Sequence, residues 1–224
     1  MKGAKKLLVC GDSYMALSPY IFNATGDSSI EQINQIHWTN HISEDYSVIN
    51  LAQPGASNLM ILAQVKKGIH KYAPEAIVIG FTSFERLEML APASEKEIFP
   101  ELEYVTSCHS EMTPDRKKFH ALYLDLYPIS LRHLQESMVL EYTLLLSAKH
   151  APTAHSMGLA SRHVFLEQNQ FPRITDPWKS ELKTKLTTGA HWGISEKNSG
   201  SFHVKDPEHH RHYAKEINDW LLTI

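Results

Sequence analysis

The sequence predicts a doubly wound α/β domain, in which helices cover both faces of a central parallel sheet. Three short apolar runs, each ending at turn residues, are typical of buried parallel strands. Segments with helical spacing of their apolar residues separate these runs. The chain has 224 residues, of which 42% are hydrophobic, and this suits a domain with a substantial core. We therefore expect a single domain over residues 1–224.

The expected strands are Leu7–Cys10, Tyr46–Leu51 and Ala76–Gly80, which are rich in apolar or β-branched residues. A fourth strand is expected within Pro152–Phe165, where the pattern is less regular. Strands that alternate with helices favour right-handed crossovers, and these produce a parallel sheet.

Helices are expected at Ser29–His41, at Ser57–Tyr72 and over residues 118–149, with an interruption of the last at Pro128. A stripe of apolar residues follows this proline, and we interpret it as core packing. Its members are Leu131, Leu134, Met138, Leu140, Tyr142 and Leu145.

Residues 91–117 contain three prolines and break the alternation of strands and helices. A stretch of this length without periodicity predicts a lid or an insertion. Residues 167–202 are rich in Pro, Thr, Ser, Gly and Lys, and we expect a loop there with one short helix after Pro177.

A terminal helix is expected to begin at Asp206 and Pro207, because Asp is a preferred N-cap and Pro suits the first helical position. Its predicted apolar face consists of Tyr213, Ile217, Trp220, Leu221 and Ile224.

Composition and charge exclude several classes of function. A formal net charge of −3 provides no basic field for nucleic acid or anionic membrane. No apolar run approaches the roughly 18 residues that span a bilayer, and Leu7–Cys10 is too short for a signal peptide. Cys10 and Cys108 have no metal-binding spacing and suggest no disulfide framework. We expect a soluble cytoplasmic protein without nucleic-acid or membrane partners.

The candidate functional residues lie after the predicted strands. Ser13 follows the first strand, Gly55 the second and Thr82 the third, while His203 precedes the terminal helix. Loops after parallel strands meet at one edge of the sheet, where ligands bind. A serine hydroxyl at such an edge becomes a nucleophile when a base reaches it. The alternative for Ser13 is a simple helix cap, and for Gly55 a turn glycine.

In order and spacing these residues resemble the SGNH (GDSL-type) hydrolase superfamily, over nearly the whole chain. Gly11-Asp12-Ser13 is similar to the first block of that family, and Gly55 to the glycine of the second block. The resemblance implies a flavodoxin-like three-layer α/β/α sandwich. It also implies Ser13 as the nucleophile, His203 as the base, and N–H groups of Ser13 and Gly55 as oxyanion donors.

Two positions depart from the family pattern. Thr82 occupies the place of the asparagine donor of the third block, and Gly200 the place of the aspartate that precedes the histidine. Thr82 is therefore an expected third oxyanion donor with a shorter reach. A rival base is His209, three residues after Asp206, but we favour His203 because Asp206 is explained as an N-cap.

The resemblance implies a serine esterase or deacylase that hydrolyses an O-acyl ester through an acyl-serine intermediate, with acylated carbohydrate among the candidate substrates. Two alternatives remain open. The first is a catalytically weak SGNH-like protein that binds a ligand such as carbohydrate or is associated with a virion, and the second is an O-acyltransferase. The Gly-Ala-Ser-Asn stretch of the second block also resembles SGNH-like proteins of bacteriophages.

No cofactor is expected. The histidines His203, His209, His210 and His212 cluster in the sequence, but no cysteine accompanies them and their acidic neighbours are explained by the helix start. We therefore predict no metal site. Glu85 and Arg86 are interpreted as a surface or structural ion pair, although an arginine at a strand end also suits an acidic substrate.

Overall fold

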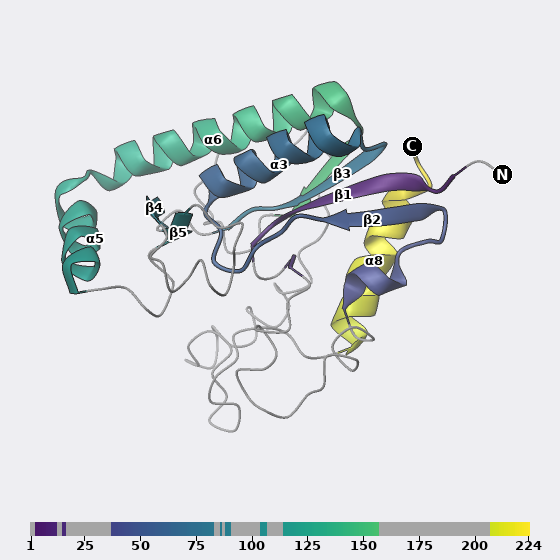
Figure 1. Ribbon diagram of the computed structural model, residues 1–224, viewed down its shortest axis with the longest axis horizontal. Helices are drawn as coiled ribbons and strands as arrows, with labels where there is room; N and C mark the ends of the chain where they lie inside the picture. Colours follow the sequence, from purple (N-terminus) through teal and green to yellow (C-terminus); the bar gives the residue numbers. More distant parts are fainter. Residues whose placement is uncertain are drawn as a thin grey trace.

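The centre of the molecule is a four-stranded sheet in the order β2-β1-β3-β6, and all neighbouring strands are parallel (Figure 1). The strands are β1 (Lys5–Gly11), β2 (Tyr46–Asn50), β3 (Ala76–Gly80) and β6 (Thr153–Ser156). All four strands predicted from the sequence are therefore confirmed. In this computed structural model the described residues are 3–12, 15–16, 37–82, 86, 88–90, 104–106, 114–156 and 207–224.

Helices cover both faces of the sheet, as the α/β/α sandwich requires (Figure 1). One face carries α3 (Asn58–Tyr72) and α6 (Ile129–His150), and the other carries α8 (Pro207–Leu221) with the short 3-10 helix η1 (Trp38–His41). The predicted fold class is confirmed.

The side chains of β1 point alternately to the two faces of the sheet and so pack against both helical layers. Leu8 and Cys10 pack in one buried cluster with residues of α3 and α6, while Leu7 and Val9 pack in a second cluster with residues of α8. Successive strand residues point to opposite faces, so an all-apolar strand must be covered on both sides. Each fully buried leucine contributes roughly 1.5–3 kcal/mol to folding.

Helix α3 begins and ends with local signals. The hydroxyl of Ser57 accepts a hydrogen bond from the N–H of Met60 at 3.2 Å, which caps the first turn. At the other end Ala73 adopts a left-handed conformation with φ 47°. The helix predicted from Ser57 to Tyr72 is confirmed.

The segment predicted to be irregular contains regular structure. Helix α5 (Pro114–Leu126) starts inside it, because Pro114 occupies a first helical position, where proline is tolerated. The strand β5 (Tyr104–Thr106) also lies within this segment, and it pairs antiparallel with β4 (Glu88–Leu90), which precedes the segment. The break between α5 and α6 lies at the predicted proline, Pro128. Residues 91–103 and 107–113 lie outside the described residues.

The prediction for the apolar stripe on α6 is largely wrong. Leu140 is buried against α3 together with Leu144, but the other five predicted core residues are 40–61% exposed. Helical periodicity places the two sets on opposite sides of α6, and only one side can face the sheet. The exposed set is Leu131, Leu134, Met138, Tyr142 and Leu145.

The terminal helix is confirmed, with one correction. Tyr213, Ile217 and Leu221 are buried against the sheet, and Trp220 is partly buried beside them. Ile224 is 43% exposed because α8 ends at Leu221, so it does not share the buried face. Asp206 lies outside the described residues.

The last residues of the helix predicted at Ser29–His41 do not continue an α-helix, because His37 has an extended backbone. Trp38–His41 forms a 3-10 turn, capped by His37, whose side chain accepts from the N–H of Thr39. Trp38 is fully buried and lies edge-on to Tyr213 at 5.1 Å between ring centroids. Residues 29–36 lie outside the described residues.

Among the residues that the structure describes, no helix is long and apolar enough to cross a bilayer. Cys10 is buried with a free thiol, and burial raises the pKa of that thiol far above its usual range. It is therefore an inert core residue, as the sequence predicts.

Candidate functional site

The ends of the central strands are aligned at one edge of the sheet. Gly11, the last residue of β1, pairs in register with Gly80 of β3, and Gly80 pairs with Ser156 of β6. Because the strands are parallel, these ends form a common carboxyl edge, where ligands of open α/β sheets bind. The residues that follow the strands therefore start beside one another.

The side chain of Met15 leaves no room for a Cβ atom at two of these strand ends, Gly11 and Gly80. A Cβ atom on Gly11 would lie 2.4 Å from Met15 Cγ, and one on Gly80 would lie 2.3 Å from the same atom. The side chain of Met15 thus occupies the space of both missing Cβ atoms. Its sulfur accepts a hydrogen bond from the hydroxyl of Tyr213 at 3.5 Å, which connects this edge to α8.

The segment after β1 is anchored at both ends. The carbonyl of Asp12 accepts hydrogen bonds from the N–H groups of Met15 at 3.1 Å and Ala16 at 3.0 Å. At the far end, the amide of Asn50 donates to the carbonyl of Met15 at 2.7 Å. Ser13, the predicted nucleophile, falls between these anchors in the sequence but outside the described residues.

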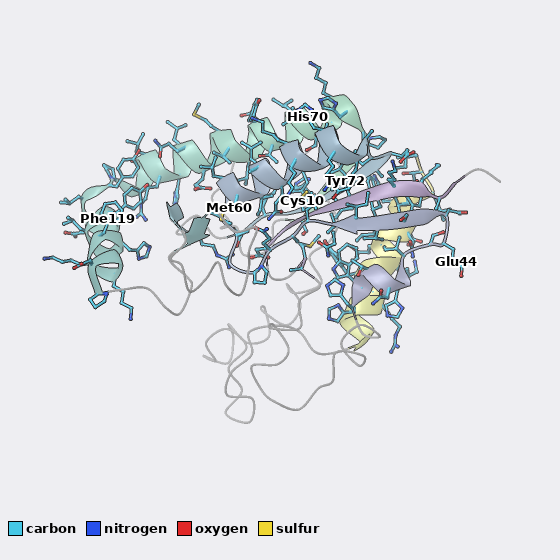
Figure 2. All side chains as sticks on the ribbon, viewed as in Figure 1. Cys10, Glu44, Met60, His70, Tyr72 and Phe119 are labelled. Atoms are coloured by element: carbon cyan, nitrogen blue, oxygen red, sulfur yellow. The ribbon has the colours of Figure 1, made fainter. Side chains whose placement is uncertain are left out.

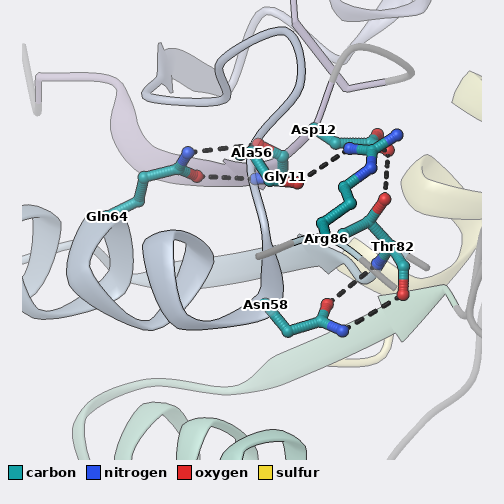
Figure 3. A network of polar contacts seen from close by, with 7 residues as sticks. All are labelled: Gly11, Asp12, Ala56, Asn58, Gln64, Thr82 and Arg86. Carbon is teal, nitrogen blue, oxygen red and sulfur yellow. Dashed lines mark hydrogen bonds and ion pairs between the residues drawn. The ribbon is translucent and has the colours of Figure 1, made fainter. Parts of the chain in front are cut away.

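Gln64 of α3 fixes the last residue of β1. Its amide oxygen accepts from the N–H of Gly11 at 2.8 Å, and its amide nitrogen donates to the carbonyl of Gly11 at 3.1 Å (Figure 3). Gln64 is buried, so both bonds lie away from water. A buried side chain that pairs with both backbone groups of one residue holds that residue in a single position.

Gly55 lies in a tight turn after β2. The N–H of Ala56 donates to the carbonyl of Gln53 at 3.1 Å, and Gly55 has φ 75°. Pro54 precedes it, and proline followed by a residue with positive φ is the pattern of a type II turn. The predicted turn position of Gly55 is confirmed. Its role as an oxyanion donor stays a prediction.

A buried ionic network lies where the loops after β1, β2 and β3 meet (Figure 3). The Asp12 carboxylate is 2% exposed and accepts from the hydroxyl of Thr82 at 2.7 Å. The Arg86 guanidinium lies 3.1 Å from the same carboxylate oxygen and also donates to the carbonyl of Ala56 at 2.7 Å. We call Asp12, Thr82 and Arg86, with Asn58, the Asp12 network.

Asn58 links this network to α3 and α6. Its amide oxygen accepts from the N–H of Thr82 at 2.9 Å, and its amide nitrogen donates to the carbonyl of Thr82 at 3.1 Å. The same nitrogen lies 3.0 Å from a carboxylate oxygen of Glu136 on α6. The position of the third strand end therefore depends on the first residue of α3.

These contacts bear on the predicted role of Thr82. Its N–H, its carbonyl and its hydroxyl are all engaged in hydrogen bonds, and the residue is fully buried. To donate to a substrate oxygen, the hydroxyl would have to leave Asp12. The oxyanion role of Thr82 stays a prediction, and the observed contact is with Asp12.

The charge on Asp12 is balanced inside the site. A buried carboxylate without a partner is costly, but here an arginine and a hydroxyl both bind the same oxygen. Because Arg86 also binds the carbonyl of Ala56, one guanidinium connects the loop after β1 to the Gly55 turn. The network can therefore hold backbone donors of two loops in a fixed relation.

Several residues of the predicted site and its surroundings lie outside the described residues: Ser13, Glu85, Gly200, His203 and Asp206. His209 belongs to α8, where its backbone alone is described. The structure pairs Arg86 with Asp12, a partner that was not predicted from the sequence. Asn58 and Gln64 were not predicted as site residues either. A usable signal was their spacing, which places them on the side of the predicted helix that also carries the apolar residues Ile61 and Val65.

The described histidines of α8 make contacts within the protein. The ring of His210 is buried and accepts from the N–H of Trp38 at 3.3 Å, and His212 lies 3.2 Å from Glu216. In the described part of the chain, no group of three His, Cys, Asp or Glu side chains is placed to hold a metal ion.

No protein-family model and no curated protein matches this chain. Among solved structures, a member of the lipolytic G-D-S-L family from Veillonella parvula DSM 2008 is similar, at 10% identity and a TM-score of 0.51. The alignment covers 99% of this chain and 100% of that chain. This likeness shows that the chain has the fold of a lipolytic G-D-S-L protein.

Two further structures cover nearly the whole chain at lower TM-scores. An acetyl xylan esterase, AlAXEase, is 12% identical at a TM-score of 0.49, with 98% of this chain and 100% of that chain covered. TesA is 10% identical at a TM-score of 0.47, with 97% of this chain and 98% of that chain covered.

Proposed function

We propose that this protein is a serine esterase or deacylase of the SGNH type, with Ser13 as its nucleophile. The observation that carries the proposal is the anchoring of Asp12 at the carboxyl edge of the sheet. Asp12 directly follows β1, whose register is fixed, and its own carbonyl and carboxylate are both held by contacts; Ser13 is the next residue in the sequence. A nucleophile needs such a rigid support, because small displacements of the attacking atom cost much of the rate.

In the proposed mechanism the hydroxyl of Ser13 attacks the acyl carbon of an ester, and His203 takes the hydroxyl proton. His203 returns this proton to the departing alcohol, which leaves an acyl-serine. Water then attacks the acyl-serine with the same base, and the acid is released. The N–H groups of Ser13 and Gly55 stabilise the oxyanion, a contribution that is typically worth roughly 100- to 1,000-fold in rate per donor. Thr82 assists from the end of β3.

The substrate class of the proposal is an O-acyl ester, including acylated carbohydrate, and the chemistry needs no cofactor. Three observations support it: the fold of a lipolytic G-D-S-L protein, the Gly11-Asp12-Ser13 sequence at the end of β1, and the glycine turn after β2. The cytoplasmic location and the bacteriophage-type resemblance stay predictions from the sequence.

Turnover of p-nitrophenyl acetate and labelling by a fluorophosphonate probe test the proposal. We expect the wild-type protein to show both, and Ser13→Ala to lose labelling and at least about 1,000-fold in kcat/KM. His203→Ala should lose a comparable factor, because the hydroxyl then lacks its base. Ser47→Ala and His70→Ala are matched controls on exposed residues of β2 and α3, and both should retain full turnover.

Equal turnover by wild type and Ser13→Ala would contradict the proposal. The binding scaffold is then the better account, because Gly200 replaces the usual aspartate and the hydroxyl of Thr82 is engaged by Asp12. Adding an alcohol as a second acceptor separates a hydrolase from an acyltransferase. A hydrolase releases free acid at an unchanged rate, whereas a transferase forms the new ester.

A further inference from the structure

We propose that the protein forms a two-fold symmetric dimer in which the α6 helices of two copies pack antiparallel, centred on Met138. The interface is the exposed apolar stripe of α6, which consists of Leu131, Leu134, Met138, Tyr142 and Leu145. The partner is a second copy of this chain.

The stripe lies on the side of α6 that faces away from its own core. Leu140 and Leu144 pack against α3 in the core, and they occupy the opposite side of the helix. Figure 2 shows side chains projecting from the outer side of α6 along its length. Met138 is 61% exposed and Leu134 is 56% exposed, so this second face is unpartnered within the described residues.

The spacing of the stripe is self-complementary. Leu131 and Leu145 lie seven residues on either side of Met138, and Leu134 and Tyr142 lie four residues on either side of it. An antiparallel two-fold axis through Met138 therefore places Leu131 opposite Leu145 and Leu134 opposite Tyr142 of the other copy. A two-fold interface requires this reciprocity, in which one residue contacts a second and the second contacts the first.

The exposed area is large enough for a stable dimer. Each large side chain offers roughly 150–250 Å² when free, so the five residues of the stripe expose on the order of 500 Å². Buried on both copies, the stripe amounts to about 1,000 Å² of surface in total, the size that a specific interface should reach.

Sedimentation equilibrium tests the mass in solution. We expect twice the 25.5 kDa of one chain for the wild type. Met138→Lys and Met138→Glu should each be monomeric, with dimerisation weakened roughly 100-fold or more, because like charges then meet at the axis. An equimolar mixture of the two variants should recover the dimer. Leu222→Lys, a change of the same kind on a residue that is 84% exposed beyond α8, is the matched control and should remain dimeric.

Disulfide cross-linking tests the register, in a Cys108→Ser background. Met138→Cys should cross-link to itself, and Leu131→Cys should cross-link only when mixed with Leu145→Cys. Self-linking of Leu131→Cys would overturn the antiparallel arrangement in favour of a parallel one. A monomeric wild type at every soluble concentration would overturn the dimer, and the stripe would then be covered by other residues of its own chain.

Discussion

Asp12 and His37 are both almost fully buried, yet their surroundings favour opposite charge states. Asp12 meets a guanidinium and a hydroxyl at one oxygen, which suits a carboxylate. His37 lies beside the rings of Trp38 and His210, and burial, followed by the proximity of His210, lowers its pKa to about 3. The fold thus stabilises a charge at the carboxyl edge of β1 and excludes one beside α8.

The largest effect should follow from removing the positive partner of Asp12. Arg86→Met leaves a buried carboxylate without its counter-ion, and we expect a loss of about 3–5 kcal/mol in the free energy of unfolding. Urea denaturation at neutral pH measures this loss. Arg86→Lys keeps the charge and should lose clearly less.

Combining Arg86→Met with Asp12→Asn should recover much of that loss, because neither charge is then buried alone. A loss below about 1 kcal/mol for Arg86→Met would mean that the ion pair contributes no more than a surface pair.

A smaller effect is expected when one donor to Asp12 is removed. Thr82→Val deletes a hydrogen bond to a charged acceptor while keeping the shape of the side chain, and we expect a loss of about 2 kcal/mol in unfolding free energy. Thr82→Ser retains the hydroxyl and serves as the matched control. Equal stability of the valine and serine variants would show that the hydroxyl does not stabilise Asp12.

The smallest of the three effects, when measured between neutral pH and pH 5.5, is the pH dependence of stability that His37 causes. The folded pKa lies below the ordinary value of 6.5, so the neutral ring is favoured in the folded state. The resulting stability is complete above pH 6.5 and is lost as pH falls toward 3, by about 1.4 kcal/mol for each pH unit. Denaturation midpoints between neutral pH and pH 5.5 measure this slope.

His37→Asn should flatten the slope, because asparagine does not titrate but can still cap η1. His70→Asn is the matched control on the exposed surface of α3 and should leave the slope unchanged. A slope that is the same in wild type and His37→Asn would contradict the assignment.

The two central strands, β1 and β3, were predictable from the sequence because each contains a continuous apolar run that is buried on both faces of the sheet. Val9 and Val78 are examples, since each lies in such a run and each is fully buried. The start of α3 was predictable for a local reason as well, because Ser57 caps its own helix. These features depend on residues that are close together in the sequence.

The Asp12 network and the outer face of α6 were not predictable in the same way. Asp12 and Arg86 are 74 residues apart, and no periodic pattern connects an aspartate after one strand to an arginine after another. In α6 the apolar residues occupy two sides of the helix, and their spacing does not indicate whether Leu140 or Met138 meets the sheet. Such features depend on tertiary packing.

The contact of Met15 with Gly11 and Gly80 makes it possible to distinguish residues that folding requires from residues that activity requires. Gly11 belongs to the Gly-Asp-Ser motif, yet the space it leaves is filled by a methionine side chain that also touches Gly80. A library screened for folding alone should therefore retain glycine at positions 11 and 80 and accept many residues at position 13. A screen for ester turnover should add the requirement for serine.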